Sequence, residues 1–282
     1  MIPQLPETLD DLNNKIKQAS PTLSKRLRQV ADYVLEAPRE VAFGTVATLS
    51  KAAQVHPSTW VRFANAFGFS GFSEMQGLFQ QNLLSQTSNY QERVRLVRNE
   101  WPSGDVEDSA HQILSQFCEE NARSLEQLAE NISKDDLTTS ITLLQQALSV
   151  HIVGVRRAFS VASYFAYGLR HIERKAYLID GIAGMFEEQA AALDKNDVLI
   201  VVSFAPYGEE TLNVANLAAQ KGVPLIVLSD SHSNPLASMA KVNFVVRDAQ
   251  VQSFRGLSSS MCLAQAIIIG LAHALEKENA NG

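Results

Sequence analysis

The sequence predicts an all-α domain followed by an α/β domain of three layers, with a five-stranded parallel sheet as the middle layer. Three observations carry this prediction. Apolar residues recur at helical spacing through residues 1–85, whereas beyond residue 106 short apolar runs alternate with helical segments. Between them, residues 86–105 are polar and charged and close on Trp-Pro-Ser-Gly, which is typical of a linker. A chain of 282 residues is long enough for two ordinary domains, here 1–85 and 106–282.

The composition is that of a folded protein with an uneven charge. Hydrophobic residues make up 46% and charged residues 19%, so the chain can bury a core. The net charge of −6 excludes a protein that coats nucleic acid nonspecifically. Residues 1–100 carry 11 Lys and Arg against 9 Asp and Glu, while residues 101–282 carry 13 against 21. A weakly basic head on an acidic body fits a DNA-binding domain joined to a domain that avoids phosphodiester backbones.

Cysteine usage and the chain ends indicate a cytoplasmic protein. Cys118 and Cys262 lie far apart and outside any metal-ligand spacing, so we expect two core thiols in a reducing compartment, with no metal site and no cofactor. The first twelve residues lack the basic region and apolar core of a signal peptide. The longest apolar run, residues 261–275, is interrupted by polar residues and too short to span a bilayer, so no membrane partner is expected.

The first domain is predicted to contain five helices. Apolar spacing indicates helices over residues 9–19 and 23–36, two short helices within 45–67, and a closing helix over 72–85. In the short pair, Thr45 is an N-cap candidate, and Pro57 suits the first position of the second helix because its missing N–H would have no partner there. The tight turn between them makes the pair a helix-turn-helix candidate.

The second helix of this pair has one apolar and one polar face. Trp60, Phe63, Ala64 and Phe67 recur at helical spacing and are expected to face inward. Ser and Thr can contact phosphates, and Arg and Asn can bind base edges with two hydrogen bonds, so the other face suits a DNA major groove. The alternative is an amphipathic hairpin inside an ordinary helical bundle. The predicted DNA-binding residues are Thr45, Ser58, Thr59, Arg62 and Asn65.

Residues 30–76 resemble the N-terminal domain of the RpiR family of bacterial transcription regulators. The resemblance rests on the Y-x-L-x-x-P-x-x-V-A-F lead-in, the T-x-x-R-F recognition helix and the G-F-x-G-F exit, all present in VADYVLEAPREVAFGTVATLSKAAQVHPSTWVRFANAFGFSGFSEMQ. Two residues depart from the family pattern. His56 stands where the family usually has a capping Ser, and Trp60 stands where it usually has Val or Ile, which implies a locally repacked core.

The second domain is expected to begin with helices over residues 106–129 and 134–148 and to continue as alternating strands and helices. Such alternation implies a parallel sheet covered on both faces, with ligands binding at the carboxyl ends of the strands. The predicted strands are residues 150–153, 176–179, 198–202, 225–228 and 244–246, separated by helices over 159–172, 185–193, 209–221 and 235–239.

Two strand ends carry candidate ligand-binding residues. Gly154, Arg156 and Arg157 follow the first strand at a helix N-terminus, where backbone N–H groups favour an anion and guanidinium groups can clamp it. Ser203, Tyr207 and Thr211 follow the third strand and supply hydroxyls where another helix begins. The alternative is that Gly154 only makes a tight turn and that both arginines are surface charges.

Residues 148–247 resemble a SIS (sugar isomerase) domain, a flavodoxin-like fold that usually accompanies an RpiR-type head. The resemblance implies a dimeric or tetrameric repressor or activator whose SIS domain senses a phosphosugar and whose head binds double-stranded operator DNA. The ligand-binding role that the resemblance implies carries over to Gly154, Ser203 and Thr211. The family's G-x-G-x-S and S-x-S-G-x-T motifs are altered here, so Arg156, Arg157 and Tyr207 are assigned from their chemistry. The altered loops leave a sugar acid or polyol derivative as an alternative ligand.

Two further expectations concern the end of the chain and catalysis. The apolar helix over residues 257–276 is expected at a subunit interface, or else to cap the sheet, and the serines at its start to cap the helix or contact ligand. A sugar-phosphate isomerase is the alternative function. Glu209, Glu210, His171 and His232 form no convincing acid–base pair, and a helix-turn-helix head has no role in such an enzyme. We therefore predict a non-enzymatic transcription regulator of a sugar or polyol catabolic pathway.

Overall fold

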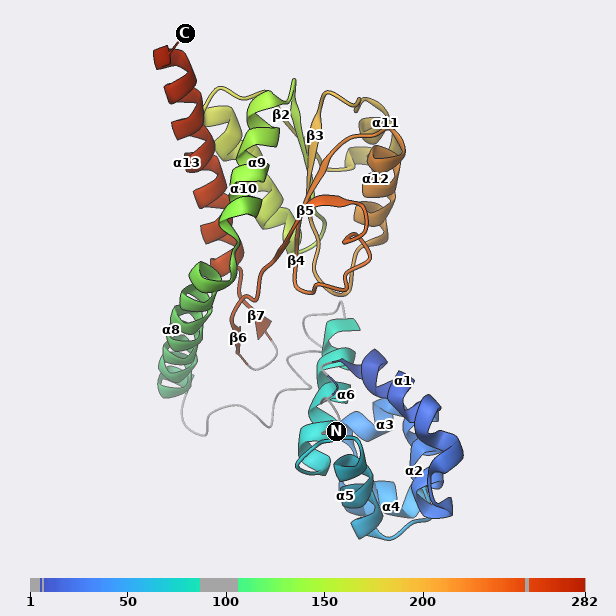
Figure 1. The fold of residues 1–282 in the computed structure, drawn as a ribbon. Coiled ribbons are helices and arrows are strands. Elements are labelled where there is room, and N and C mark those ends of the chain that lie inside the picture. Colours follow the sequence, from blue (N-terminus) through green and yellow to red (C-terminus); the bar gives the residue numbers. More distant parts are fainter. Residues whose placement is uncertain (1–5, 7, 87–105, 252–253, 282) are drawn as a thin grey trace. The chain divides into compact units, whose positions relative to one another are not determined.

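The computed structural model describes residue 6 and residues 8–86, 106–251 and 254–281. The chain divides into two compact units, Met1–Asn99 and Glu100–Gly282, each described on its own below (Figure 1). All but the first residue of the predicted linker, 86–105, lie outside the described residues.

The first unit is entirely helical in its described part. The prediction of five helices is wrong by one, because residues 38–43 form a short additional helix, α3. Pro38 suits the first turn of that helix. Gln76 Nε2 donates to the carbonyls of Val41 and Gly44 at 2.8 and 2.9 Å, and Gln80 Nε2 donates to Ala42. The helices are α1 (Leu9–Ala19), α2 (Lys25–Glu36), α3 (Pro38–Phe43), α4 (Val46–Ala52), α5 (Pro57–Ala66) and α6 (Phe72–Gln86), with a 3₁₀ turn, η1, at Ser20–Thr22.

Trp60 lies at the centre of the first unit's core. Its side chain is fully buried and makes edge-on ring contacts with Tyr33 and Phe72, at centroid distances of 6.0 and 5.5 Å. The Tyr33 hydroxyl donates to Glu40 of α3, and this hydrogen bond, with burial and the Glu40 charge, raises the pKa of Tyr33 to about 12. The core around Trp60 therefore extends through Tyr33 to the start of the additional helix.

As predicted, the second unit is a three-layer α/β fold with a five-stranded parallel sheet. The strand order in the structure is β2-β1-β3-β4-β5. The predicted helix over residues 235–239 is wrong: these residues form turns, and β5 begins earlier than expected, at Ala240. The elements are α8 (Val106–Asn131), α9 (Lys134–Gln146), β1 (Val150–Val153), α10 (Ala158–His171), β2 (Ala176–Ile179), η3 (Ile182–Gly184), α11 (Phe186–Ala191), β3 (Val198–Val202), α12 (Glu209–Gln220), β4 (Leu225–Ser229), β5 (Ala240–Val245), the β6–β7 hairpin (Gln250–Val251, Phe254–Arg255) and α13 (Ser258–Asn281).

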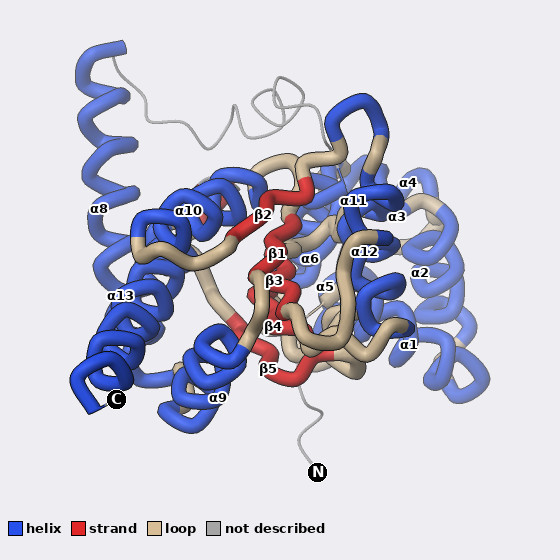
Figure 2. Tube along the Cα trace, turned by 90° about the horizontal axis from the view of Figure 1, so that it is seen from above, coloured by secondary structure: helices blue, strands red, loops and turns tan. Residues whose placement is uncertain are grey.

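Alternate residues of each central strand face two separate cores. In β3, Ile200 belongs to the core shared with α9, α10 and α13, whereas Leu199 and Val201 belong to the core shared with α11 and α12. Figure 2 shows α10 and α13 on one side of the sheet and α11 and α12 on the other. Both faces are covered, so the polar groups that follow the strands meet only at the carboxyl edge of the sheet.

The last helix, α13, buries Leu263, Ile267 and Leu271 and exposes Ile269. Among the described residues, α13 is the one helix whose length and composition alone would allow it to cross a membrane. In this fold its inner side packs against α9 and α10 as part of the core. The expectation of two core thiols is wrong. Cys262 on α13 and Cys118 on α8 are free and exposed, because each falls on the outer face of its helix.

Candidate functional site

The α4–α5 pair forms the predicted helix-turn-helix with both caps in place. Thr45 Oγ1 accepts the Thr48 N–H at 3.2 Å, which confirms the predicted N-cap of α4. His56 occupies the cap position of α5, and its Nδ1 accepts the Ser58 N–H at 3.3 Å and lies 2.9 Å from Ser58 Oγ. The imidazole thus replaces the capping hydroxyl usual in the family that this segment resembles.

The outward face of α5 carries most, but not all, of the side chains predicted to contact DNA. Ser58, Arg62 and Asn65 are exposed. Thr59 is not, because only 2% of its surface is accessible, so its predicted place on the polar face is wrong. Thr59 lies one turn before Phe63, at i and i+4, and therefore shares the buried stripe.

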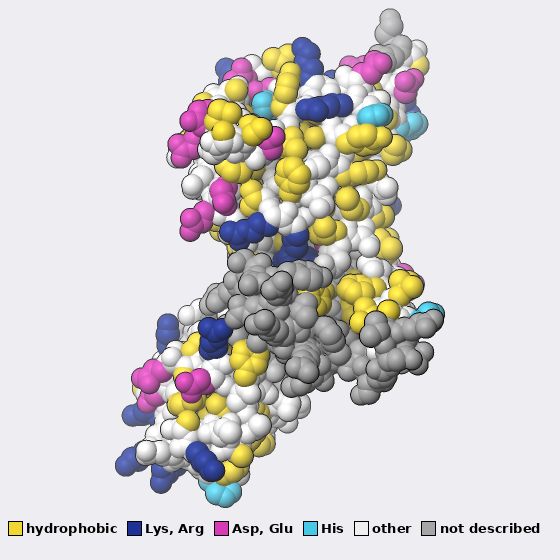
Figure 3. Space-filling model, turned by 180° about the vertical axis from the view of Figure 1, so that it is seen from behind, with side chains coloured by type: hydrophobic (Ala, Val, Ile, Leu, Met, Phe, Trp, Pro, Cys, Tyr) yellow, Lys and Arg dark blue, Asp and Glu magenta, His cyan; other side chains and the backbone are white. Residues whose placement is uncertain are grey.

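Basic side chains of α2 differ in how they are held. Arg28 donates to the carbonyls of Ser20 and Pro21 at 3.1 Å each, which commits its guanidinium to the end of the preceding turn. Arg26 reaches Gln54, in the turn between α4 and α5, with Nη1 3.4 Å from the carbonyl oxygen. On the face that Figure 3 shows, both units carry Lys and Arg as well as Asp and Glu side chains.

In the second unit, the loops after β1 and β3 lie against each other, as the strand-end prediction requires. A Cβ at Gly154 would lie 3.1 Å from the carbonyl oxygens of both Ala158 and Val202, and a Cβ at Gly208 would lie 2.4 Å from Val155 Cγ2. A Cβ at Gly154 would press on two backbone carbonyls and one at Gly208 would displace the Val155 side chain, so glycine at both positions favours the close approach of the two loops. Arg157 Nη2 donates to the Ala205 carbonyl at 2.7 Å, so one predicted clamp arginine bridges the two loops.

Two predicted hydroxyls lie beneath these loops. Ser203 and Thr211 are 3% and 0% exposed. Thr211 Oγ1 is buried in the first turn of α12 and has no hydrogen-bond partner within the described residues. Arg156 is exposed and holds a left-handed backbone conformation, with φ +57°. We call the site made by Gly154, Arg156, Arg157, Ser203, Tyr207 and Thr211 the strand-end site.

Asp230, which directly follows β4, was missed by the sequence analysis and organises this edge of the sheet. Its carboxylate accepts the Ala205 N–H, the Tyr207 hydroxyl at 3.2 Å and Arg255 Nη1 at 2.7 Å. Burial and the Asp230 charge raise the pKa of Tyr207 to about 12, so this phenol stays protonated at neutral pH. The rule that selected the other strand ends would also have found Asp230, since it is the first charged residue after an apolar strand.

Arg255 extends this network to the last helix. It lies 2.7 Å from Asp230, with its guanidinium carbon 4.4 Å from the Phe204 ring centroid, and its Nε lies 3.5 Å from Asp248. Asp248 accepts both the N–H and the hydroxyl of Ser260 at the start of α13, at 3.0 and 2.6 Å. Ser260 is thus held by protein. The Asp248 carboxylate, and not the Ser260 hydroxyl, accepts the N–H of the first turn, so Ser260 donates to a cap and does not act as one. No sequence pattern marks Arg255, which lies in a two-residue strand.

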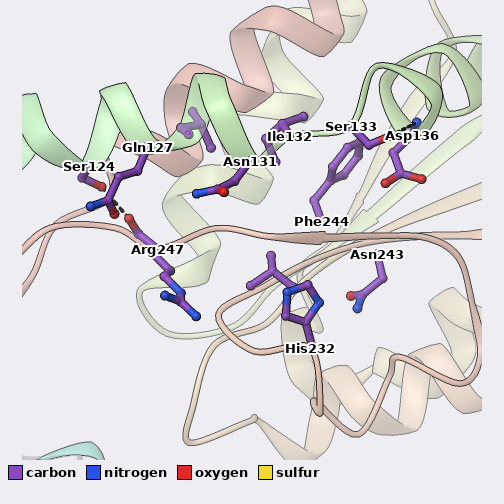
Figure 4. Close-up of a pocket in the computed structure, with 12 residues that line it drawn as sticks. Ser124, Gln127, Asn131, Ile132, Ser133, Asp136, His232, Asn243, Phe244 and Arg247 are labelled. Atoms are coloured by element: carbon purple, nitrogen blue, oxygen red, sulfur yellow. Dashed lines mark hydrogen bonds between the residues drawn. The ribbon is translucent and has the colours of Figure 1, made fainter. Parts of the chain in front are cut away.

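A pocket of about 240 Å³ lies apart from the strand-end site. It opens between α8, α9, the loop after β4 and the end of β5 (Figure 4). The strand-end residues are absent from its lining, which consists of Ser124, Gln127, Leu128, Asn131, Ile132, Ser133, Asp136, His232, Asn243, Phe244, Val245 and Arg247. Among the described residues, no group of three or more His, Cys, Asp or Glu is placed to hold a metal ion.

Comparison with known families matches each unit separately. The model of the helix-turn-helix domain of the rpiR family matches residues 10–86, and that of the SIS domain matches residues 143–270. The chain belongs to the RpiR family of transcription regulators. The family order, a helix-turn-helix head followed by a SIS domain, is the order of this RpiR-family chain.

Curated relatives include proteins named as regulators. An HTH-type transcriptional regulator of Haemophilus influenzae, called uncharacterized, is 26% identical over 93% of this chain and 88% of its own length. The regulator HexR of Pseudomonas aeruginosa is 24% identical, over 81% of this chain and 76% of its own. The chain matches only 40% of the length of the Bifunctional protein glk of Burkholderia orbicola, at 24% identity over 95% of this chain.

Two solved structures share the fold. The Vibrio vulnificus NanR protein complexed with ManNAc-6P aligns with a TM-score of 0.56 and 23% identity, over 95% of this chain and 94% of its own. The sugar isomerase domain of an RpiR transcription factor from Sphaerobacter thermophilus aligns with a TM-score of 0.55 and 20% identity, over 61% of this chain and 99% of its own. The NanR alignment spans nearly the whole chain, whereas the Sphaerobacter alignment covers the sugar isomerase domain alone, so the two show a shared fold.

Proposed function

We propose that this regulator controls a sugar or polyol catabolic pathway and that its strand-end site binds a phosphosugar or related anionic sugar. The observation that carries the proposal is Thr211 Oγ1, which is fully buried in the first turn of α12 without a hydrogen-bond partner in the described part of the chain. An unpaired buried hydroxyl is costly, and a ligand oxygen would satisfy it. Backbone N–H groups of the same helix turn favour an anion there.

The charges around this site support an anion with hydroxyl groups better than a bare phosphate. Arg156 and Arg157 supply positive charge from the β1 loop, with Arg157 held in place by Ala205. Glu209 and Glu210 open α12 and oppose a highly charged ligand. Hydroxyl groups are suited to the carboxylate of Asp230 and to Ser203, which lie after neighbouring strands. A sugar acid or sugar phosphate would pair with the two arginines through its anionic group and with Asp230 and Ser203 through its hydroxyl groups.

The DNA-binding part of the proposal uses the outward face of α4 and α5. Arg62 and Asn65 would contact base edges, and Thr45 and Ser58 would contact backbone phosphates. These four side chains are exposed on adjoining elements, whereas buried Thr59 is excluded from the contact set. Two such faces are needed to bind a palindromic operator, so we propose a cytoplasmic homodimer or homotetramer.

Exposed apolar side chains supply a surface for that assembly. Phe159 and Tyr167 of α10 and Ile269 of α13 are 42%, 58% and 66% exposed on helices that pack together over one face of the sheet. An anionic sugar that binds one assembly geometry better than another would shift the population toward it. That shift would change the spacing of the two recognition helices and hence operator affinity.

An isomerase is the second candidate, and the described residues do not favour it. His171 is exposed, stacks on Tyr167 at a centroid distance of 4.1 Å and lies on α10. His232 lines the separate pocket, and Glu209 and Glu210 are exposed at the start of α12. These groups come from different parts of the unit, so we propose that the chain has no catalytic activity.

A thermal-shift screen with sugar phosphates, sugar acids and inositol derivatives tests the proposal. We expect at least one to raise the melting temperature of the parent, and Thr211→Val to remove that shift. Thr211 Oγ1 has no protein partner, so the substitution should leave the unliganded protein as stable as before or slightly more so. A ligand that stabilises Thr211→Val as strongly as the parent would contradict the assignment. Turnover of any hit would favour the isomerase.

A further inference from the structure

The pocket beside β5 is built from four segments of the second unit. Gln127 and Asn131 come from the last turns of α8, Asp136 from the first turn of α9, His232 from the loop after β4, and Arg247 from the segment just after β5 (Figure 4). Its volume of about 240 Å³ is smaller than the usual 300–1,000 Å³ of sites for drug-sized ligands, so it suits a molecule of monosaccharide size.

The walls of this pocket are held by protein contacts. Ser124 Oγ lies 2.5 Å from the Arg247 carbonyl oxygen and 2.7 Å from Ser259 Oγ, which joins α8 to β5 and α13. Ser133 Oγ accepts the Asp136 N–H as the N-cap of α9, and Asn243 Oδ1 accepts from Asn234. The hollow therefore has a defined shape before any ligand enters.

The polar side chains around the hollow are free, in contrast to its walls. Within the described residues, the side chains of Gln127, Asn131, Asp136, His232 and Arg247 make no hydrogen bond or ion pair with protein. Ion pairs and backbone carbonyls occupy other arginines of this unit, such as Arg255 and Arg174. Four of these five residues, all but Asp136, are exposed, so their polar groups are open to a ligand that enters the hollow from solvent.

The chemistry of these groups defines the ligand. The planar guanidinium of Arg247 matches a carboxylate or phosphate, and the His232 ring supplies a further donor. The Asp136 carboxylate and the amides of Gln127 and Asn131 match hydroxyl groups. The apolar surface of Ile132 and Phe244 suits the C–H groups of a sugar.

We infer that this pocket is a second binding site for a small hydroxylated anion, separate from the strand-end site. A ligand that bridges Arg247 to Gln127 and Asn131 joins α8 to the end of β5. Because α8 is the first described helix after the residues that connect the two units, the ligand stabilises the helix nearest in sequence to the DNA-binding head. The second site stands independently of the function proposed above.

The test is calorimetric titration of the full chain with D-gluconate, and separately with D-glucose 6-phosphate, so that carboxylate and phosphate are distinguished. We expect the parent to bind at least one, Arg247→Gln to weaken that binding by tenfold or more, and Asn131→Asp to weaken it through charge repulsion. Arg123→Gln, a matched change elsewhere on α8, should leave the affinity unchanged. Neutral D-glucose should bind far more weakly.

Three results would overturn the second site. The first is absence of binding of both anions to the parent at millimolar concentration. The second is binding that Thr211→Val removes and Arg247→Gln leaves intact, which would assign the ligand to the strand-end site. The third is equal binding to the parent, Arg247→Gln and Asn131→Asp, with circular dichroism confirming that all are folded. Failure of the proposed function would be seen in a different measurement: no sugar anion would change the affinity of the protein for its operator.

Discussion

The outward face of α5 and the strand-end site differ in how many chain segments build them. The α5 face consists of residues a few positions apart on one helix, so helical period and burial decide which side chains are offered. The strand-end site joins the loops after β1 and β3, and the Asp230–Arg255 network beside it adds the loop after β4, the β6–β7 hairpin and the start of α13. A one-segment surface depends on its own helix being folded, whereas a five-segment site depends on the whole unit.

Removing Trp60 should have the largest effect, because it should unfold the first unit, which carries the α5 face, and leave the second unit folded. We expect Trp60→Ala to destabilise the first unit by about 3–5 kcal/mol, the usual cost of deleting a large buried aromatic. Hydrogen exchange should accelerate in the described helices of that unit and stay unchanged in β1 and β3. Equal acceleration in both units would show that they do not fold independently.

Removing Asp230 should destabilise the second unit alone, because this carboxylate connects the segments around the strand-end site. Asp230→Ala leaves the Arg255 guanidinium and the Tyr207 hydroxyl without their acceptor, at a cost of about 2–3 kcal/mol in the unfolding free energy of the second unit. The isosteric Asp230→Asn retains one acceptor and should cost less. Denaturant unfolding measures both, and equal stability of Asp230→Ala and parent would contradict the role given to this carboxylate.

Arg62 and Thr59 form a matched pair on the α5 face. Arg62→Ala should weaken operator binding by about 1–3 kcal/mol, the range for one bidentate base contact. Thr59→Val should leave operator affinity unchanged, because this side chain is buried and replaced by one of similar size. Electrophoretic mobility shifts on a selected DNA site measure both affinities. An Arg62→Ala protein that binds as tightly as the parent would remove α5 as the recognition helix.

The smallest expected effect concerns His151, at the other end of the sheet. Burial lowers the pKa of His151 below its ordinary 6.5, and the Asp197 charge only partly opposes this. The unfolded chain therefore binds a proton first as pH falls, so stability is fully present above pH 6.5 and declines below it. Thermal unfolding of His151→Gln against the parent should show this slope only in the parent. Parallel pH profiles would contradict it.

Sequence alone determined much of the fold because strong periodicities govern it. Short, β-branched apolar runs such as Val198–Val202 favour strands buried on both faces, and their alternation with helices predicts the parallel sheet. The prediction missed α3, because Pro38 both ends one helix and begins the next, and placed a helix at 235–239 where turns occur. Both errors fall on short segments whose conformation depends on tertiary contacts.

The sites were less predictable, for a reason that the two regions make plain. Thr59 was misplaced because it lies one helical turn before Phe63 and so shares the buried stripe despite its polar side chain. Arg255 could not have been found, because only the fold brings the hairpin that carries it to Asp230. Asp230 itself obeys the strand-end rule, so stricter use of that rule would have found it.

One measurement tests the central claim, that a helical head binds DNA while a separate sheet-based domain detects an anionic sugar. Operator affinity should be titrated in the presence of the best ligand from the thermal-shift screen, for the parent and for the double variant Ser203→Ala with Thr211→Ala. The account predicts that the ligand changes the operator affinity of the parent, and that the double variant binds operator equally well with and without it. An unaltered ligand response in the double variant would contradict the account.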